Sequence, residues 1–155
     1  MAIKILLTFP DVGDLKGSST FGTHKDKTEV SSFSYGLSQS SHNGVTQGLR
    51  NHNDVSLSKA GDEISAMLAL YCSNGTKIAK TVVEFTQLDR QAGEVVYATY
   101  TLTDSVITSF NISANSSGGD DTWIETFTLS FGAIAAKIAG KDYADDTRVD
   151  VGAVT

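Results

Sequence analysis

Alternating apolar and polar residues predict strands along much of the chain, and the clearest example is FSYGLSQS at residues 33–40. In an extended strand, successive side chains point to opposite faces. One face would carry large apolar side chains and the other small neutral ones: Phe33, Tyr35 and Leu37 against Ser34, Gly36 and Ser38. The apolar face can pack against a core. The neutral face is unusual, because residues 30–49 contain no Asp, Glu, Lys or Arg, whereas solvated surfaces normally carry charge.

The same pattern predicts the other elements of the chain. Strands are expected near residues 3–9, 29–39, 55–57, 80–88, 94–103, 106–113 and 123–137, with a long loop at 10–28. The only helix is expected at residues 62–73, where apolar side chains recur at helical spacing: Ile64, Met67, Leu68, Tyr71 and Cys72. Asp62 or Ser58 can cap its start, and the Asn-Gly pair at 74–75 can end it. A second Asn-Gly pair, at 43–44, predicts a tight turn.

A series of strands with one inserted helix predicts a mainly β fold, either a barrel or a sandwich with the helix as plug or flank. A chain of 155 residues is long enough for one domain with its own core. We assign residues 1–140 to that domain. The remainder, KDYADDTRVDVGAVT at 141–155, is polar and weakly patterned, so we expect a mobile or docking tail.

Composition argues against several classes of function. The net charge of −6, without a basic cluster, argues against nucleic-acid binding, which needs clustered Lys and Arg. Cys72 is the only cysteine, which excludes an internal disulfide and suits a reducing compartment. The apolar run at residues 5–9 is too short for a signal peptide, and no stretch approaches the length of a membrane span. We therefore expect no membrane insertion and no classical export.

Residues that could support catalysis or metal binding have simpler explanations. His24, His42 and His52 fall in predicted loops without metal-ligand spacing, so exposed loop histidines are expected. Cys72 lies on the apolar stripe of the helix and is expected to be a buried, inert thiol. Asp104 could act as a general base, but a charge at a kink between two strands explains it as well. We therefore predict no catalytic residue, no metal and no cofactor.

Ionic side chains are also sparse in the second half of the chain. Asp104 is the only Asp, Glu, Lys or Arg between residues 95 and 119, and Glu125 is the only one between 122 and 136. A neutral face of this kind suits a subunit interface, whose core is depleted in charge, or a smooth interior channel. A solvated Ser/Thr-rich sheet is the alternative.

Four blocks of sequence resemble the haemolysin-coregulated protein (Hcp) family, the tube protein of the bacterial type VI secretion system. The blocks are MAIKILLTFPDV, EVSSFSYGLSQS, NDVSLSKAGDEISAMLALYCSNGTKI and VVYATYTLTDSVITSFNISANSSGGDDTWIETFTLSFGAIAAKI. They occur in the family's order and cover nearly all of residues 1–139. The serial match is more specific than any one block.

The resemblance implies a small β-barrel of two packed sheets with one flanking α-helix, which assembles into a six-membered ring. Rings of this family stack into a tube inside a contractile sheath and are expelled with a spike at the tip. The implied partners are further copies of the chain, effector proteins in the ring lumen, the spike and the sheath. The implied location is cytoplasmic before firing, followed by secretion without a signal peptide. On this basis we expect small neutral groups to face the lumen: Ser32, Ser34, Gly36 and Ser38.

Two other functions remain compatible with the residues. The chain could be a monomeric β-barrel module that binds carbohydrate or protein. It could also be a hydrolase, although no nucleophile-elbow motif supports this.

Overall fold

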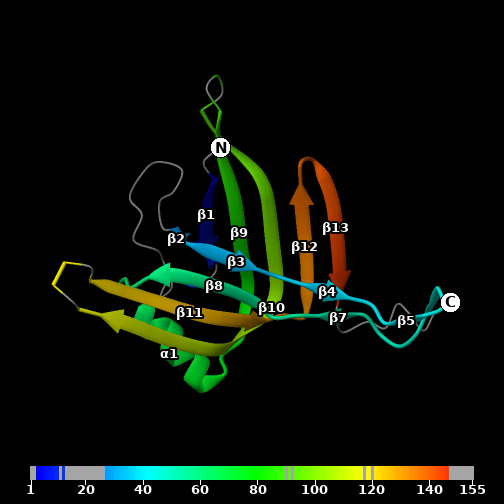
Figure 1. The fold of residues 1–155 in the computed structure, drawn as a ribbon, viewed down its shortest axis with the longest axis horizontal. Helices are drawn as coiled ribbons and strands as arrows, with labels where there is room; N and C mark the ends of the chain where they lie inside the picture. Colours follow the sequence, from blue (N-terminus) through cyan, green and yellow to red (C-terminus); the bar gives the residue numbers. More distant parts are fainter. Residues whose placement is uncertain are drawn as a thin grey trace.

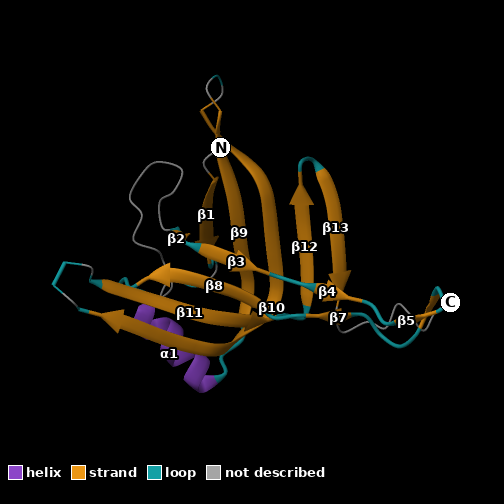
Figure 2. Ribbon diagram, viewed as in Figure 1, coloured by secondary structure: helices purple, strands orange, loops and turns teal. Residues whose placement is uncertain are grey.

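The computed structural model describes residues 3–10, 12, 27–89, 91, 93–116, 118–119 and 121–146, and these form a mainly β fold with one helix (Figures 1 and 2). The long strands are β1 (Ile3–Thr8), β8 (Val55–Ala60), β9 (Ile78–Asp89), β10 (Gly93–Asn115), β11 (Thr122–Ser130), β12 (Ala133–Ile138) and β13 (Lys141–Asp146). The short strands are β2 (Thr28–Val30), β3 (Ser32–Ser34), β4 (Leu37–Ser38), β5 (Ser41–His42), β6 (Val45–Thr46) and β7 (Asn51–His52). The helix is α1 (Ser65–Asn74). The predicted mainly β fold class with one helix is confirmed, although the described strands do not close a barrel, and the six-membered ring stays a prediction.

Nine of the strands form one strongly bent sheet. Hydrogen-bonded neighbours follow the order β2-β1-β9-β10-β11-β8-β3, and β12 and β13 extend from the first part of β10. We call the part containing β1, β9, β12 and β13 the first half, and the part containing β3, β8 and β11 the second half. Among the described residues no pairing joins β2 to β3, so the ladder of hydrogen bonds stays open there.

Two corners connect the halves. At one corner β10 runs through both halves and turns at Asp104, whose φ of 54° is rare for a residue other than glycine. At the other corner Ser31 separates β2 from β3, and its backbone N–H donates to Ser58 O at 2.7 Å. The two halves therefore face each other around one core, as expected for two packed sheets.

The inner faces of both halves carry the apolar side chains. The second half contributes Leu57, Phe127 and Leu129, and the first contributes Leu7, Val83, Leu102 and Ile134, all 2% exposed or less. Phe33 and Tyr35 are partly buried against this cluster, as the alternation in residues 33–40 predicts. Leu37 does not follow the prediction: it is 49% exposed, because the chain has left the core by that point.

Helix α1 covers one end of the core and packs on β10. The predicted stripe is confirmed: Ile64 and Leu68 are buried, and Met67, Tyr71 and Cys72 pack partly against the core. Gly75 ends the helix with φ of 63°, and the N–H groups of Gly75 and Thr76 donate to Cys72 O and Tyr71 O. The helix starts later than predicted, and its N-cap residue, Ile64, has no capping side chain of its own; the predicted Asp62 nevertheless accepts from the N–H of Ile64 through Oδ1 at 3.1 Å.

Four predicted strands are joined or divided differently in the structure. The segments 94–103 and 106–113 are one strand, because the residues on both sides of Asp104 stay paired with β9 despite the kink. The segment 123–137 is two strands, because the chain breaks at Gly132, whose N–H donates to Thr103 O at 2.9 Å. The segment 29–39 is divided into β2, β3 and β4 by Ser31 and by residues 35–36.

Strand β13 lies in the segment assigned to the tail. The boundary at residue 140 stays a prediction, and residues 147–155 lie outside the described residues.

Residues 37–52 form a hairpin, which we call the arm, that projects from the body beyond β3 and β8 (Figure 1). Its predicted turn is confirmed, since Asn43 and Gly44 both have positive φ, 51° and 80°. Its strands pair only as β4 with β7 and β5 with β6, in two sheets separate from the nine-stranded one. Every residue from 37 to 49 is exposed.

Candidate functional site

The outer face of the second half is a neutral polar surface, which we call the hydroxyl face. Two rows of side chains cross β3, β8, β11 and β10 in register: Ser32, Ser58, Thr126 and Asn111 in one, and Ser34, Ser56, Thr128 and Ser109 in the other. The residues between them in sequence, including Phe33, Leu57 and Phe127, point to the core. Because side chains alternate along every strand, one register provides both surfaces.

Hydroxyls on this face hydrogen-bond to one another. Ser58 Oγ lies 3.1 Å from Thr126 Oγ1, and Ser109 Oγ lies 2.7 Å from Thr128 Oγ1. Thr108 Oγ1 lies 2.7 Å from the same Thr128 oxygen and donates to Asp54 Oδ2 at 2.9 Å, at the border of the face. The surface can therefore keep its polar groups paired without ionic side chains, and it offers neutral donors and acceptors to whatever lies opposite.

Only two of the four residues predicted to face a lumen belong to this face. Ser32 and Ser34 are exposed and lie in its two rows. Ser38 is exposed but belongs to the arm, paired with Asn51. Gly36 is half-buried, and a Cβ there would come within 2.6 Å of Asn53 Nδ2, the end of an exposed side chain that would have to move. Whether Ser32 and Ser34 face a lumen stays a prediction.

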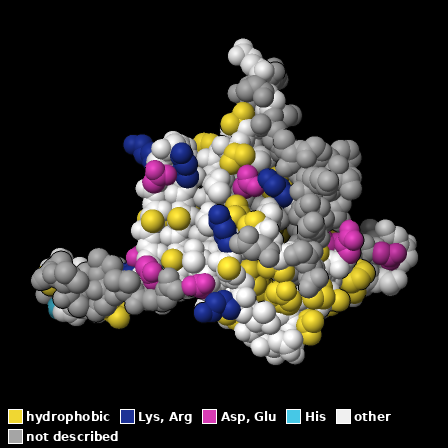
Figure 3. Space-filling view, turned by 180° about the vertical axis from the view of Figure 1, so that it is seen from behind, with side chains coloured by type: hydrophobic (Ala, Val, Ile, Leu, Met, Phe, Trp, Pro, Cys, Tyr) yellow, Lys and Arg dark blue, Asp and Glu magenta, His cyan; other side chains and the backbone are white. Residues whose placement is uncertain are grey.

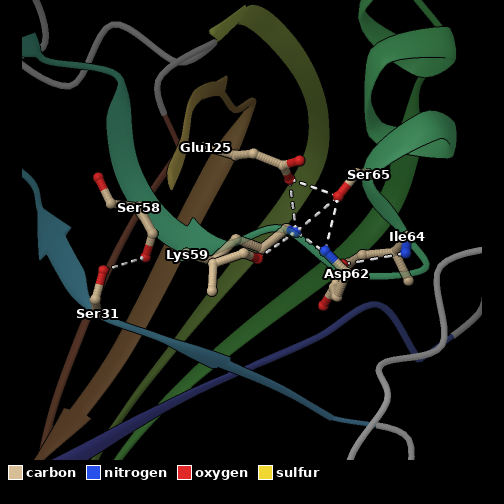
Figure 4. Close-up of polar contacts among 8 residues, drawn as sticks. Ser31, Ser58, Lys59, Asp62, Ile64, Ser65 and Glu125 are labelled. Atoms are coloured by element: carbon tan, nitrogen blue, oxygen red, sulfur yellow. Dashed lines mark hydrogen bonds and ion pairs between the residues drawn. The ribbon is translucent and has the colours of Figure 1, made fainter. Parts of the chain in front are cut away.

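Behind the hydroxyl face, a buried ionic network joins β8 and β11 to the start of the helix (Figure 4). The Lys59 ammonium, on a fully buried side chain, donates to Glu125 Oε1 at 2.7 Å and to Asp62 Oδ1 at 2.7 Å. Ser65 Oγ donates to the same Glu125 oxygen at 2.7 Å, and Asp62 Oδ1 also accepts from the N–H of Ile64 at 3.1 Å. The network therefore fixes the first turn of α1 against the sheet.

The charges in this network depend on one another. Removing one partner of a buried ion pair costs about 3–5 kcal/mol, because the other charge is left uncompensated. The dependence is strong here, since Glu125 is also fully buried and its second oxygen, Oε2, has no hydrogen-bond partner. Sequence reasoning did not identify this network, although Glu125 stood out as the only charge in its segment.

We predict that Lys59→Met lowers the free energy of unfolding by about 3–5 kcal/mol, because it leaves two carboxylates facing each other without a cation. Lys27→Met is the matched control: Lys27 pairs with Glu84 at 2.6 Å, but the two side chains are 23% and 18% exposed, so at most about 1 kcal/mol is expected. Urea denaturation measures both. Equal losses in the two variants would contradict the assigned role of Lys59.

A second polar cluster lies where the arm leaves the body, and we call it the root cluster: Tyr35, Arg50, His52 and Asp145. The Arg50 guanidinium donates to both oxygens of Asp145, from Nε at 2.9 Å and from its terminal nitrogen at 3.0 Å. His52 Nε2 lies 2.7 Å from Asp145 Oδ2, and His52 Nδ1 lies 2.7 Å from the Tyr35 hydroxyl. The predicted exposed loop histidine is therefore wrong for His52, whose side chain is only 5% exposed.

The root cluster resembles a nucleophile–histidine–carboxylate arrangement, but its electrostatics suit a structural role. The hydrogen bonds from Arg50 and His52 hold the pKa of Asp145 below its ordinary value, against the opposing effect of burial. Ionised Asp145 only accepts, so His52 donates from Nε2 and accepts the Tyr35 hydroxyl at Nδ1. Burial, together with Tyr143 and Asp145, raises the pKa of Tyr35 well above its usual range. Tyr35 is therefore a hydrogen-bond donor and a poor nucleophile at neutral pH.

We predict that acid weakens the root cluster through Asp145. A carboxylate with a lowered pKa contributes stability that is complete above its unfolded value, about 3.9, and is lost as the pH falls through the folded value. Wild-type stability should therefore fall more steeply below pH of about 4 than that of Asp145→Asn, in which the group no longer titrates. Thermal unfolding from pH 7 to pH 2 measures the difference, and parallel curves for the two proteins would contradict it.

The other candidate residues lie apart. His42 is exposed in the arm, Cys72 is partly buried on the helix, and Asp104 lies at the kink of β10, as its alternative explanation proposed. His24 and most of the loop at 10–28 lie outside the described residues. Within the described part of the chain, no group of three or more His, Cys, Asp or Glu could hold a metal ion. No helix in that part is long and apolar enough to span a membrane.

Comparisons with known proteins point to one family. Residues 7–138 match the family model described as Type VI secretion system effector, Hcp. Hcp1 from Salmonella typhimurium has a TM-score of 0.78 and 24% identity, over 97% of this chain and 98% of that chain. Hcp1 from the E. coli EAEC 042 pathovar has a TM-score of 0.78 and 19% identity, over 94% of this chain and 98% of that chain. Hcp3 from Pseudomonas aeruginosa has a TM-score of 0.70 and 18% identity, over 95% of this chain and 98% of that chain. No curated protein matches the sequence. The structural likeness establishes a shared fold.

Proposed function

The chain belongs to the Hcp family of type VI secretion system proteins, and we propose that it is a structural tube subunit that forms six-membered rings. In this proposal the rings stack, carry effector proteins in their lumen and are expelled with a spike from a contractile sheath. The chain is cytoplasmic before firing and leaves the cell through the apparatus. The observation that carries the proposal is the hydroxyl face: a sheet surface of eight neutral polar side chains in a chain with a net charge of −6.

Net charge supports assembly through neutral surfaces. Identical copies that each carry −6 repel one another, so their contacts are favoured where ionic groups are absent. Besides the arm, exposed apolar side chains lie on α1 and near the ends of β10 and β11: Leu70, Ile112 and Trp123 are 46%, 55% and 52% exposed. Figure 3 shows hydrophobic side chains gathered on this side of the molecule. A ring closed by rotation needs two such surfaces per copy, since each contact is heterologous.

The hydroxyl face suits a passage for cargo better than it suits a ring contact. Four of its hydroxyls, on Ser58, Thr126, Ser109 and Thr128, are already paired with one another, and the whole face offers neutral hydrogen bonding without a strong apolar gain from burial. Cargo of varied charge would be neither held strongly nor repelled. We therefore propose that Ser32 and Ser34 line the lumen, with Gly36 and Ser38 near its margin at the root of the arm.

The function is structural in this proposal, and no catalytic role is assigned to any residue. In the root cluster, Tyr35 acts as a hydrogen-bond donor and Asp145 as an acceptor, so no catalytic role is needed to explain these residues. The buried network around Lys59 and Glu125 is explained by the docking of α1 on the sheet. A monomeric module that binds carbohydrate or protein would use the same hydroxyl face without a ring, and the mass of the protein in solution distinguishes the two.

We predict that the purified chain has a mass of about six times its 16.4 kDa, because ring closure uses two complementary surfaces on every copy. Size-exclusion chromatography with light scattering, over a range of concentrations, measures this mass. A single subunit at every concentration would contradict the proposal and favour the monomeric binding module.

We predict that Ser34→Lys weakens retention of an effector by roughly tenfold or more, which corresponds to about 1.4 kcal/mol, because a long charged side chain then enters the lumen six times per ring. Ser34→Thr, which keeps the hydroxyl, is the matched control. Co-purification of effector with rings measures retention, while light scattering and thermal unfolding verify that ring mass and stability are unchanged. Equal retention of effector by wild type and by Ser34→Lys would contradict the placement of Ser34 in the lumen.

A further inference from the structure

The arm lacks the features that normally give a hairpin a fixed direction. Its two ladders contain two residue pairs each, and all residues from 37 to 49 are exposed. An isolated two-stranded hairpin is marginally stable in water at best. The arm also exposes apolar side chains that it cannot cover itself: Leu37, Val45 and Leu49 are 49%, 63% and 57% exposed. It contains no ionic side chain before Arg50.

The contacts that orient the arm are concentrated at its root. Arg50 and His52, on the returning side of the arm, bind the single carboxylate of Asp145 in β13. Arg50 also donates to the backbone oxygen of Asp146. On the outgoing side, the Tyr35 hydroxyl reaches His52, and Gly36 O accepts from the N–H of Asn53 at 2.9 Å. Both sides of the arm are therefore connected, directly or through His52, to one acidic residue in the last described strand.

Aromatic packing accompanies these polar contacts at the same place. A pocket of about 250 Å³ lies beside the root, lined in part by Arg50, His52 and Phe131. The rings of Tyr35 and His52 stack with centroids 6.0 Å apart, and the His52 ring meets the edge of Phe131 at 5.7 Å. The bidentate Arg50–Asp145 pair adds a strongly directional, charge-assisted contact to this packing.

We propose that the root cluster is a positioning device: Arg50, His52 and Asp145 hold the arm in the direction in which it binds a second copy of this chain. The inference rests on the proposed function. A second copy is the occupant that fits the arm, because the arm is neutral and partly apolar, and a neutral surface avoids the repulsion between copies that each carry −6. Holding a flexible element in its bound conformation raises affinity, since less conformational entropy is lost on binding.

The test compares wild type with Asp145→Asn and Arg50→Lys. The first removes the negative charge with little change of shape, and the second keeps the positive charge but loses the fork that binds both carboxylate oxygens. Glu84→Gln is the matched control. Glu84 lies on β9, outside the arm and its root, and forms a partly exposed ion pair with Lys27. Hydrogen exchange of the amides of residues 38–51 reports the order of the arm, and mass photometry on dilution reports the concentration at which rings dissociate.

We expect faster exchange in the arm and a dissociation concentration raised tenfold or more in both root variants, with neither change in Glu84→Gln. Two results would overturn the inference: rings of wild-type affinity and unchanged arm exchange in Asp145→Asn, or an equal loss of affinity in Glu84→Gln. A wild-type chain that never forms rings would instead contradict the proposed function. The predicted effect of the root cluster on assembly would then fail as well. The two failures are distinguished by the wild-type mass alone.

Discussion

Strand alternation is the constraint on which the rest of this molecule depends. Each strand of the second half must face a dry core on one side and a neutral polar surface on the other. The pairing of Phe33 with Leu57, and of Leu57 with Phe127, places the apolar set inward and at the same time brings the hydroxyls of neighbouring strands into contact. A shift by one residue would exchange the two surfaces. The core and the hydroxyl face are therefore one feature, and neither can be changed without the other.

Ionic side chains are used at two places where geometry matters more than solubility. The fully buried Lys59–Glu125 pair ties the helix to the sheet, and its lack of exposure makes the loss of either partner costly. The Arg50–Asp145 pair is less buried, at 14% and 17% exposure, and joins the arm to β13. The first pair preserves the fold of the subunit. In our account the second preserves the direction of an element whose only apparent use is contact with another molecule.

Local patterns were sufficient to predict many parts of this fold. Alternation identified the strands, the Asn-Gly pairs identified the turn at 43–44 and the helix end at Gly75, and helical spacing identified the buried side of α1. Each of these depends on neighbours in sequence. The resemblance to the Hcp family is confirmed by the match over residues 7–138, and it is the basis for the proposed ring, which no local pattern contains.

The features that could not be predicted depend on distant residues. Asp104 was recognised as a kink, but only pairing with β9 on both sides shows that β10 continues through it. The sequence predicts an exposed loop position for His52, because its partner Asp145 is 93 positions away and leaves no local signal. Strand β13 has a polar sequence that resembles a tail, and its order comes from pairing with β12. The alternation in residues 33–40 predicts that Leu37 faces the core. The chain has already left the core at this position, so Leu37 is exposed.

The most direct test is an electron cryomicroscopy map of the purified protein at a resolution that shows side chains. The account predicts a six-membered ring with an open centre, in which Ser32, Ser34 and the other side chains of the hydroxyl face line the passage and the arms contact neighbouring copies. A ring in which the hydroxyl face is turned outward to solvent, with charged side chains lining the centre, would contradict it.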